Sequence, residues 1–224
     1  MRPDTSGVAR PALIGTTTPP GPPPRYRLRW FGVSDVAARQ FTCGHCGFSV
    51  APMKGWAAGR SEDVNNVAIA WIYVCHNCSR PTFIDNDKTQ LPGVAFGDVV
   101  RDISDDSVRL LYEEARRATG ATAYTAAVLC CRKLLMHIAV AKGADAGASF
   151  LEYVKFLGDK HFIPPGAIGW VDHIRQQGNE ANHEIVMKTK EDAEELISFC
   201  EMLLKVIYEF PAAVTKRLTP PASP

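Results

Sequence analysis

Four cysteines fall into two pairs with the same internal spacing, Cys43-x-x-Cys46 and Cys75-x-x-Cys78, and 28 residues lie between the pairs. A two-residue gap lets both thiolates of a pair reach one ion from a tight turn, and two such turns complete a tetrahedral shell of soft ligands, which suits zinc. Gly47 follows the first pair, where a turn often needs a positive φ. The spacing therefore predicts one Zn²⁺ per chain, and a closed four-cysteine shell predicts a structural role.

Two alternatives to zinc stay open: paired cysteines also hold iron–sulfur clusters or act as redox couples, or the four thiols are unrelated to one another. His45 and His76 lie inside the two pairs but are not needed as ligands, since four cysteines already close the shell. Cys130, Cys131 and Cys200 fall on apolar helical faces, and we expect them to be small buried residues.

The segment Arg25-Tyr26-Arg27-Leu28-Arg29-Trp30 alternates strictly between arginine and apolar residues. In a strand this pattern places Arg25, Arg27 and Arg29 on one face, which makes them candidate nucleic-acid contacts. The alternative is a solvated arginine face with its aromatic residues packed on the ribbon. Three arginines alone do not favour a specific footprint.

The charge and composition of the 224-residue chain limit which classes of protein it can belong to. Its hydrophobic fraction of 46% is enough for a folded core, and the net charge of +1 combines +4 in residues 1–97 with −3 in residues 98–224. Neither part is basic enough for general nucleic-acid binding. We see no targeting segment and no membrane-length apolar run, so we expect a cytoplasmic protein with no membrane partner.

The expected elements that position these residues change along the chain from short strands and turns to helices. This order predicts an α+β protein, a small β zinc ribbon followed by an all-α bundle. A proline-rich arm that we expect to be disordered comes first, and a loose tail comes last. Val67–Val74 fits a buried strand that leads into Cys75. The predicted division is 1–24 arm, 25–90 zinc ribbon, 91–103 linker, 104–212 helical domain and 213–224 tail.

Apolar periodicity predicts four main helices in the second part. Their expected ranges are 104–120, 121–142, 150–158 and Thr189 to about Pro211. Ser104-Asp105-Asp106 offers an N-cap for the first helix, the second should be the most buried, and Pro211 should end the last. A further helix should follow Pro164-Pro165 and reach about Gly178. Thr189 and Asp192 resemble a capping box at the start of the last long helix.

The stretch from His173 to His183 is dense in polar groups and lies between two apolar segments. If it is helical, Arg175, Asn179 and His183 lie four residues apart on one face. Arg132 is the second unusual residue, because it lies within the most apolar helix, where a guanidinium needs a partner. Glu113, Glu180 and Glu184 are candidates, and we expect Arg132 to lie close to Asn179 and His183.

Two motifs resemble a known family. Ile174-Arg175-x-x-Gly178-Asn179-Glu180-Ala181-x-His183 is similar to the signature of the bacterial domain-of-unknown-function family 4145, and the segment from Ala126 to Leu135 that holds Arg132 resembles its central helix. Members often carry an N-terminal zinc ribbon joined to the helices by a proline-containing segment, as at Leu91-Pro92. The resemblance covers about residues 40–212.

That family looks related to the HEPN superfamily, which implies a HEPN-like helical domain and a homodimer. Many HEPN proteins are metal-independent ribonucleases that use an arginine, a polar residue and a histidine. The resemblance therefore implies Arg175, Asn179, His183 and Arg132 as catalytic candidates. In this chain Arg175 and His183 are separated by seven residues, a wider spacing than in those ribonucleases, and Gln176 stands at the usual polar position.

Three functions follow as alternatives. We expect a module that binds RNA or a protein partner, and the HEPN resemblance implies a setting in bacterial defence or toxin–antitoxin systems. The second is a metal-independent endoribonuclease in which His183 acts as base or acid while Arg175 or Arg132 stabilises the phosphorane. The third is a protein-interaction adaptor without nucleic acid, in which the polar cluster only closes hydrogen bonds around Arg132.

Overall fold

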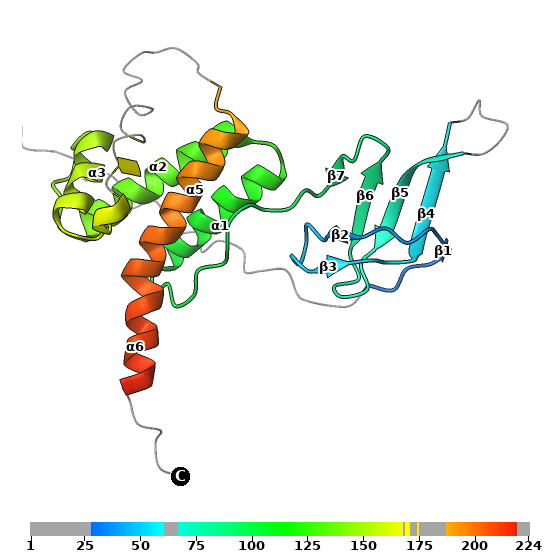
Figure 1. The fold of residues 1–224 in the computed structure, drawn as a ribbon, viewed down its shortest axis with the longest axis horizontal. Helices are drawn as coiled ribbons and strands as arrows, with labels where there is room; N and C mark the ends of the chain where they lie inside the picture. Colours follow the sequence, from blue (N-terminus) through cyan, green and yellow to red (C-terminus); the bar gives the residue numbers. More distant parts are fainter. Residues whose placement is uncertain (1–27, 61–66, 168, 171–173, 175–186, 219–224) are drawn as a thin grey trace, which may run out of the picture.

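The structure is a computed structural model that describes residues 28–60, 67–167, 169–170, 174 and 187–218. A β-sheet unit and a helical unit lie side by side, and the chain after strand β7 joins them (Figure 1). The predicted α+β class is confirmed. The proline-rich arm and the last six residues lie outside the described residues.

The β unit contains two antiparallel sheets. The larger has the strand order β1-β4-β5-β6-β7, and the smaller pairs β2 with β3. Their bounds are β1 Ser34–Asp35, β2 Phe41–Thr42, β3 Ser49–Val50, β4 Lys54–Gly59, β5 Ala68–Val74, β6 Pro81–Asp85 and β7 Gln90–Leu91. Residues 28–30, the described end of the alternating arginine segment, are not in a strand.

Strand β5 confirms the predicted strand but corrects its predicted burial. Tyr73 and the cross-strand Thr82 are buried, whereas the neighbouring Ile72 is 39% exposed. Successive side chains of a strand point to opposite faces, so the face of the larger sheet that holds Tyr73 and Thr82 is covered more completely than the face that holds Ile72. The ring of Phe41 lies 5.6 Å from that of Tyr73, which places the smaller sheet on the covered side.

The helical unit is built around helix α2, which contacts α1, α3 and α5. The helices are α1 Asp106–Gly120, α2 Tyr124–Ala141, α3 Phe150–Asp159, α5 Lys190–Leu204 and α6 Phe210–Leu218, with a 3-10 turn at Pro165–Ala167 and a π-helical turn at Lys205–Glu209. Among the described residues, α2 is the one helix long and apolar enough to cross a membrane, which is weak evidence because the core helix of a globular protein meets the same criterion. Many of its apolar side chains lie in the core of the helical unit, whereas Leu129 and Val140 are exposed.

The predicted helix starts are confirmed at three caps. The Asp105 carboxylate accepts hydrogen bonds from the amides of Ser107 and Val108. Ser149 and Thr189 each form a capping box with the acidic residue three positions later. These caps satisfy amides that have no partner inside the helix, so they fix where each helix begins.

Pro211 does not end the last helix, which corrects the prediction. The Phe210 amide donates to the Lys205 carbonyl in a π-type turn, and α6 then runs to Leu218. The wider turn gives the proline ring room that a regular α-helix would deny it. Residues 213–218 are therefore helical and not part of the tail.

Candidate metal centre and the Arg132 pocket

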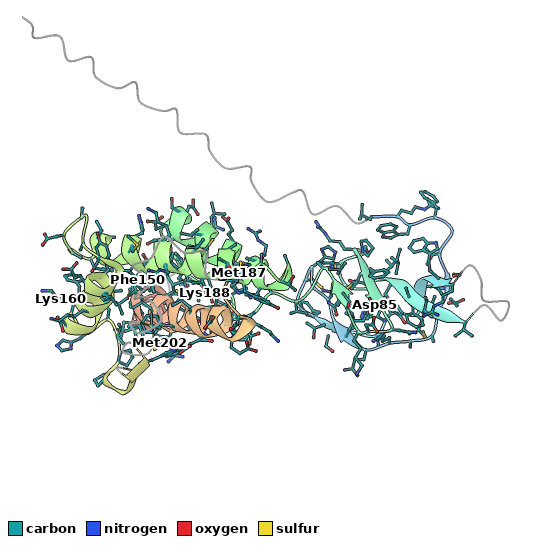
Figure 2. The ribbon with its side chains drawn as sticks, turned by 90° about the horizontal axis from the view of Figure 1, so that it is seen from above. Asp85, Phe150, Lys160, Met187, Lys188 and Met202 are labelled. Atoms are coloured by element: carbon teal, nitrogen blue, oxygen red, sulfur yellow. The ribbon has the colours of Figure 1, made fainter. Side chains whose placement is uncertain are left out.

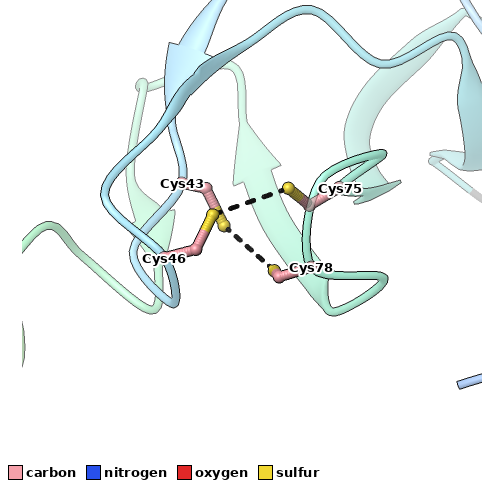
Figure 3. Close-up of side chains that lie close together, drawn as sticks. All are labelled: Cys43, Cys46, Cys75 and Cys78. Atoms are coloured by element: carbon pink, nitrogen blue, oxygen red, sulfur yellow. Dashed lines mark hydrogen bonds between the residues drawn. The ribbon is translucent and has the colours of Figure 1, made fainter. Parts of the chain in front are cut away.

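The four predicted cysteine ligands come together in one cluster (Figure 3). Their sulfur atoms all lie within 4.8 Å of one another, and the Cys43–Cys78 and Cys46–Cys75 sulfur pairs are 3.8 and 3.9 Å apart. A tetrahedral site with metal–sulfur bonds of about 2.3 Å requires sulfurs about 3.8 Å apart. The cluster therefore has the dimensions of a four-thiolate metal site.

Two matching turns position the sulfurs. The Gly47 amide donates to the Cys43 carbonyl, and the Ser79 amide donates to the Cys75 carbonyl, each at 2.8 Å. Gly47 has φ +72° and Ser79 has φ +58°, so both residues after the second cysteine adopt the left-handed conformation. The predicted positive φ at Gly47 is confirmed, and the symmetry of the turns explains why both pairs aim at one point.

Without a cation the four thiols cannot all be ionised. Burial raises the pKa of Cys43 and raises that of Cys78 to about 12. Burial would also raise the pKa of Cys46, but hydrogen bonds, first from the Asn77 amide, outweigh it and lower the pKa to about 7. Four ionised thiolates at this spacing would repel one another, so the ionised cluster needs a positive charge at its centre.

Neither histidine of the two turns belongs to the group of metal-ligating side chains found among the described residues. His45 Nε2 instead lies 3.0 Å from the Pro81 carbonyl oxygen, and His76 is exposed. Of the other cysteines, Cys131 and Cys200 are fully buried as predicted, whereas Cys130 is only half-buried.

The arginine segment is described only from residue 28 onward, so Arg25 and Arg27 lie outside the described residues. Arg29 places its guanidinium carbon 5.5 Å from the centre of the Phe31 ring. Trp30 packs edge-on against Trp56 at 5.8 Å, and its Nε1 donates to the Ser79 carbonyl at 2.7 Å. That bond ties the aromatic residues to the second cysteine turn.

Arg132 is half-buried although it lies in the most apolar helix. It lies on the flank of α2, and its guanidinium carbon is 4.5 Å from the Phe150 ring centre. A small pocket of about 20 Å³ borders it, and its lining comes from α2, α3, α5 and the segments before α5: Val128, Arg132, Phe150, Ile174, Lys188, Asp192, Glu195 and Leu196. Figure 2 labels Phe150 and Lys188 on this part of the helical unit.

The polar motif itself, with Arg175, Asn179, Glu180 and His183, lies outside the described residues, as does Glu184. Its proximity to Arg132 therefore stays a prediction. The described residues that bracket it, Ile174 and Lys188, both line the Arg132 pocket.

The most buried cation among the described residues is Arg116, which is 8% exposed and which the sequence alone did not single out. Its guanidinium binds both carboxylate oxygens of Glu113 at 3.0 Å and donates to the carbonyls of Phe96 and Gly97. Glu113 was a candidate partner for Arg132, and it pairs with Arg116 instead. The three-residue spacing of Glu113 and Arg116 on one helix was the available signal.

Comparison with known proteins gives one positive result. Neither a curated protein nor a solved structure matches the chain at a significant level. Residues 113–219 match the model of a family described as "Domain of unknown function (DUF4145)". These residues run from α1 to the end of α6 and do not include the cysteine cluster. The helical part of the chain is therefore similar to this family, and the match covers slightly less than half of the chain.

Proposed function

We propose that the chain is a zinc-stabilised module that binds single-stranded RNA, and that its zinc ion is structural. The four-thiolate cluster supports zinc, because soft ligands at tetrahedral spacing suit that ion. Four sulfurs leave no open coordination position for water or substrate. On this proposal the ion holds the two turns in place, and binding takes place elsewhere on the β unit.

The observation that carries RNA binding is the aromatic–arginine surface, which we define as Arg29, Trp30, Phe31 and Trp56. The Phe31 ring is 77% exposed and has the Arg29 guanidinium beside it. Exposed rings next to arginine are the parts from which single-strand binding sites are built, because every base has a face that can stack. Trp30 is fixed to the second cysteine turn through Ser79, so the metal site supports this surface directly.

Fluorescence anisotropy with labelled RNA oligonucleotides tests this function. Phe31→Ala should weaken single-strand binding about fivefold or more, since losing one stacked base costs about 1–3 kcal/mol. Phe48→Ala is the matched control, because Phe48 is also an exposed aromatic of the β unit, at 61% exposure. Arg29→Ala should lower both the affinity and its salt dependence.

If the zinc-loaded protein binds neither single- nor double-stranded RNA, the RNA proposal fails. If Phe31→Ala and Phe48→Ala lose the same amount of RNA affinity, the aromatic–arginine surface is not the RNA-binding site. A protein partner at this surface would then be the better explanation of the exposed Phe31.

A second candidate function is a metal-independent endoribonuclease in the helical unit. The observation that favours it is the Arg132 pocket, because Ile174, which precedes the polar motif in the sequence, and Lys188, which follows it, line this pocket together with Arg132. We propose that Arg175, Asn179 and His183 act with Arg132: the 2′-oxygen attacks the phosphorus as the P–O5′ bond breaks, and His183 takes the 2′-hydroxyl proton and returns it to the leaving 5′-oxygen. The arginines would stabilise the phosphorane.

Incubation of the purified protein with mixed RNA and EDTA tests this second function. Cleavage should persist with EDTA and disappear in His183→Ala. His161→Ala is the control, since His161 is an exposed histidine at the end of α3. Absence of cleavage in the unsubstituted protein would exclude the ribonuclease.

A further inference from the structure

The segment that joins the two units, residues 90–97, is packed between backbone on both sides. On the β side, Gln90 Nε2 donates to the Thr42 carbonyl at 2.8 Å and to the Pro92 carbonyl at 3.2 Å. A Cβ atom on Gly44 would lie 2.2 Å from the Pro92 carbonyl oxygen. Gly44 lies between the ligands Cys43 and Cys46, so the first cysteine turn rests directly on this segment.

On the helical side the same segment rests on the end of α1. A Cβ atom on Gly93 would lie 2.3 Å from the Gly120 carbonyl oxygen, and one on Gly120 would lie 2.8 Å from the Gly93 carbonyl oxygen. Real Cβ atoms do not approach so closely, and a backbone carbonyl cannot rotate away as a side chain can. Only glycine allows the two segments to meet at this distance.

Hydrogen bonds then fix the segment to the helices beyond this contact. The Phe96 amide donates to Thr119 Oγ1 at 3.0 Å, and Arg116 donates to the Phe96 carbonyl at 3.1 Å. The Asp98 amide donates to a Glu201 carboxylate oxygen of α5 at 2.8 Å. Residues 91–103, expected as a linker, are therefore anchored, and Val100 and Ile103 are buried in the helical core.

We propose that residues 90–97 form a rigid joint through which metal binding at the four cysteines sets the position of the β unit on the end of α1. This inference rests on the proposed metal site. The metal fixes the turn that holds Gly44, and Gly44 holds Pro92 and Gly93 against Gly120. When the ion leaves, the turn keeps its backbone hydrogen bonds and the polar contacts of His45 and Cys46 but loses the bonds that join it to the second turn through the metal, and the contact at Pro92 loosens.

The consequence is a metal-dependent arrangement of the two units. With the ion bound, the β unit and the helical unit act as one body. Without it, both the β unit and the joint loosen, while the core of the helical unit keeps its fold because its own apolar cluster does not include the joint residues 90–97, apart from Phe96 at its edge. A metal site that only stabilised the β unit would leave the joint unchanged.

Hydrogen exchange measured by mass spectrometry on the full chain tests this coupling, with zinc content measured on the same samples. Removing zinc with a chelator under reducing conditions should speed exchange about tenfold in peptides that cover residues 93–98 and 117–121, because their protection depends on the joint. Exchange in α3 should not change.

Gly93→Ala separates the joint from the metal site. It should keep one zinc per chain and yet show the faster exchange at residues 93–98 with zinc bound. Gly158→Ala is the control, since a Cβ there meets nothing within 4 Å, and it should behave as the unsubstituted protein. If Gly93→Ala does not fold, Gln90→Ala removes only the two side-chain hydrogen bonds and should give a smaller change in the same direction.

The outcomes separate the joint from the metal proposal. Suppose that zinc binds stoichiometrically and that its removal speeds exchange around the cysteines but not at residues 93–98. That result overturns the proposed joint and still supports the metal site. A chain that binds no zinc overturns both.

Discussion

The buried Arg116 gives the sharpest stability prediction. Replacing it with alanine removes a side chain that is 10% exposed and leaves three groups without their partner: the Glu113 carboxylate and the carbonyls of Phe96 and Gly97. Breaking a buried ion pair from one side costs about 3–5 kcal/mol, because the remaining charge stays buried. The Glu113 side chain is 28% exposed, so water can solvate part of its charge after the change.

We therefore place the expected loss for Arg116→Ala at the lower end, about 3 kcal/mol in the free energy of unfolding. The matched control is Arg109→Ala. Arg109 forms an ion pair with the same i,i+3 spacing on the same helix, with Asp106, but its side chain is 45% exposed and that of Asp106 is 83% exposed. Such a surface pair contributes about 0–1 kcal/mol.

Urea unfolding followed by circular dichroism at about 222 nm compares the two variants, with the m-value checked so that a shifted midpoint reports stability. Equal losses for Arg116→Ala and Arg109→Ala would refute the reasoning. A double-mutant cycle with Glu113→Ala should also give a coupling energy of about 0.5–3 kcal/mol, since the two side chains are in direct contact.

Three further predictions follow. Elemental analysis should find about one zinc per chain and none in Cys43→Ser, and zinc retained by that variant would contradict the ligand set. Zinc should also be released as the pH falls, because protons compete with the metal for the thiolates. Burial would raise the pKa of Glu201, but the hydrogen bond from the Asp98 amide and the charge of Lys205 outweigh it and hold the pKa below 4.5. Ionised Glu201 therefore stabilises the fold above about pH 4.5, and this stabilisation is lost as the pH falls through the folded pKa. The stability gap between the unsubstituted protein and Glu201→Gln should shrink over that acid range, and a gap independent of pH would refute this. Light scattering should give a dimer, twice the chain mass of 24.5 kDa, and a clean monomer would contradict the expected homodimer.

The sequence by itself determined the features that depend on local spacing. Two Cys-x-x-Cys pairs set the geometry of the cysteine turns, and the residues with cap-forming side chains set the starts of α1, α3 and α5. These features need only a few neighbouring residues, whose backbone conformations and hydrogen bonds are local. The α+β order of the chain followed in the same way from the change in apolar periodicity.

Only the tertiary structure decided which charged residue is buried and what the joining segment does. Arg132 looked buried because it lies in an apolar helix, but it lies on the flank of α2 over Phe150, whereas Arg116 lies in a less apolar helix and is covered by Phe96 and Gly97 from outside it. Likewise, nothing local marks Gly93 and Gly120 as contacts. Burial and close approach depend on which distant segment packs against a residue, and periodicity within one element does not specify that segment.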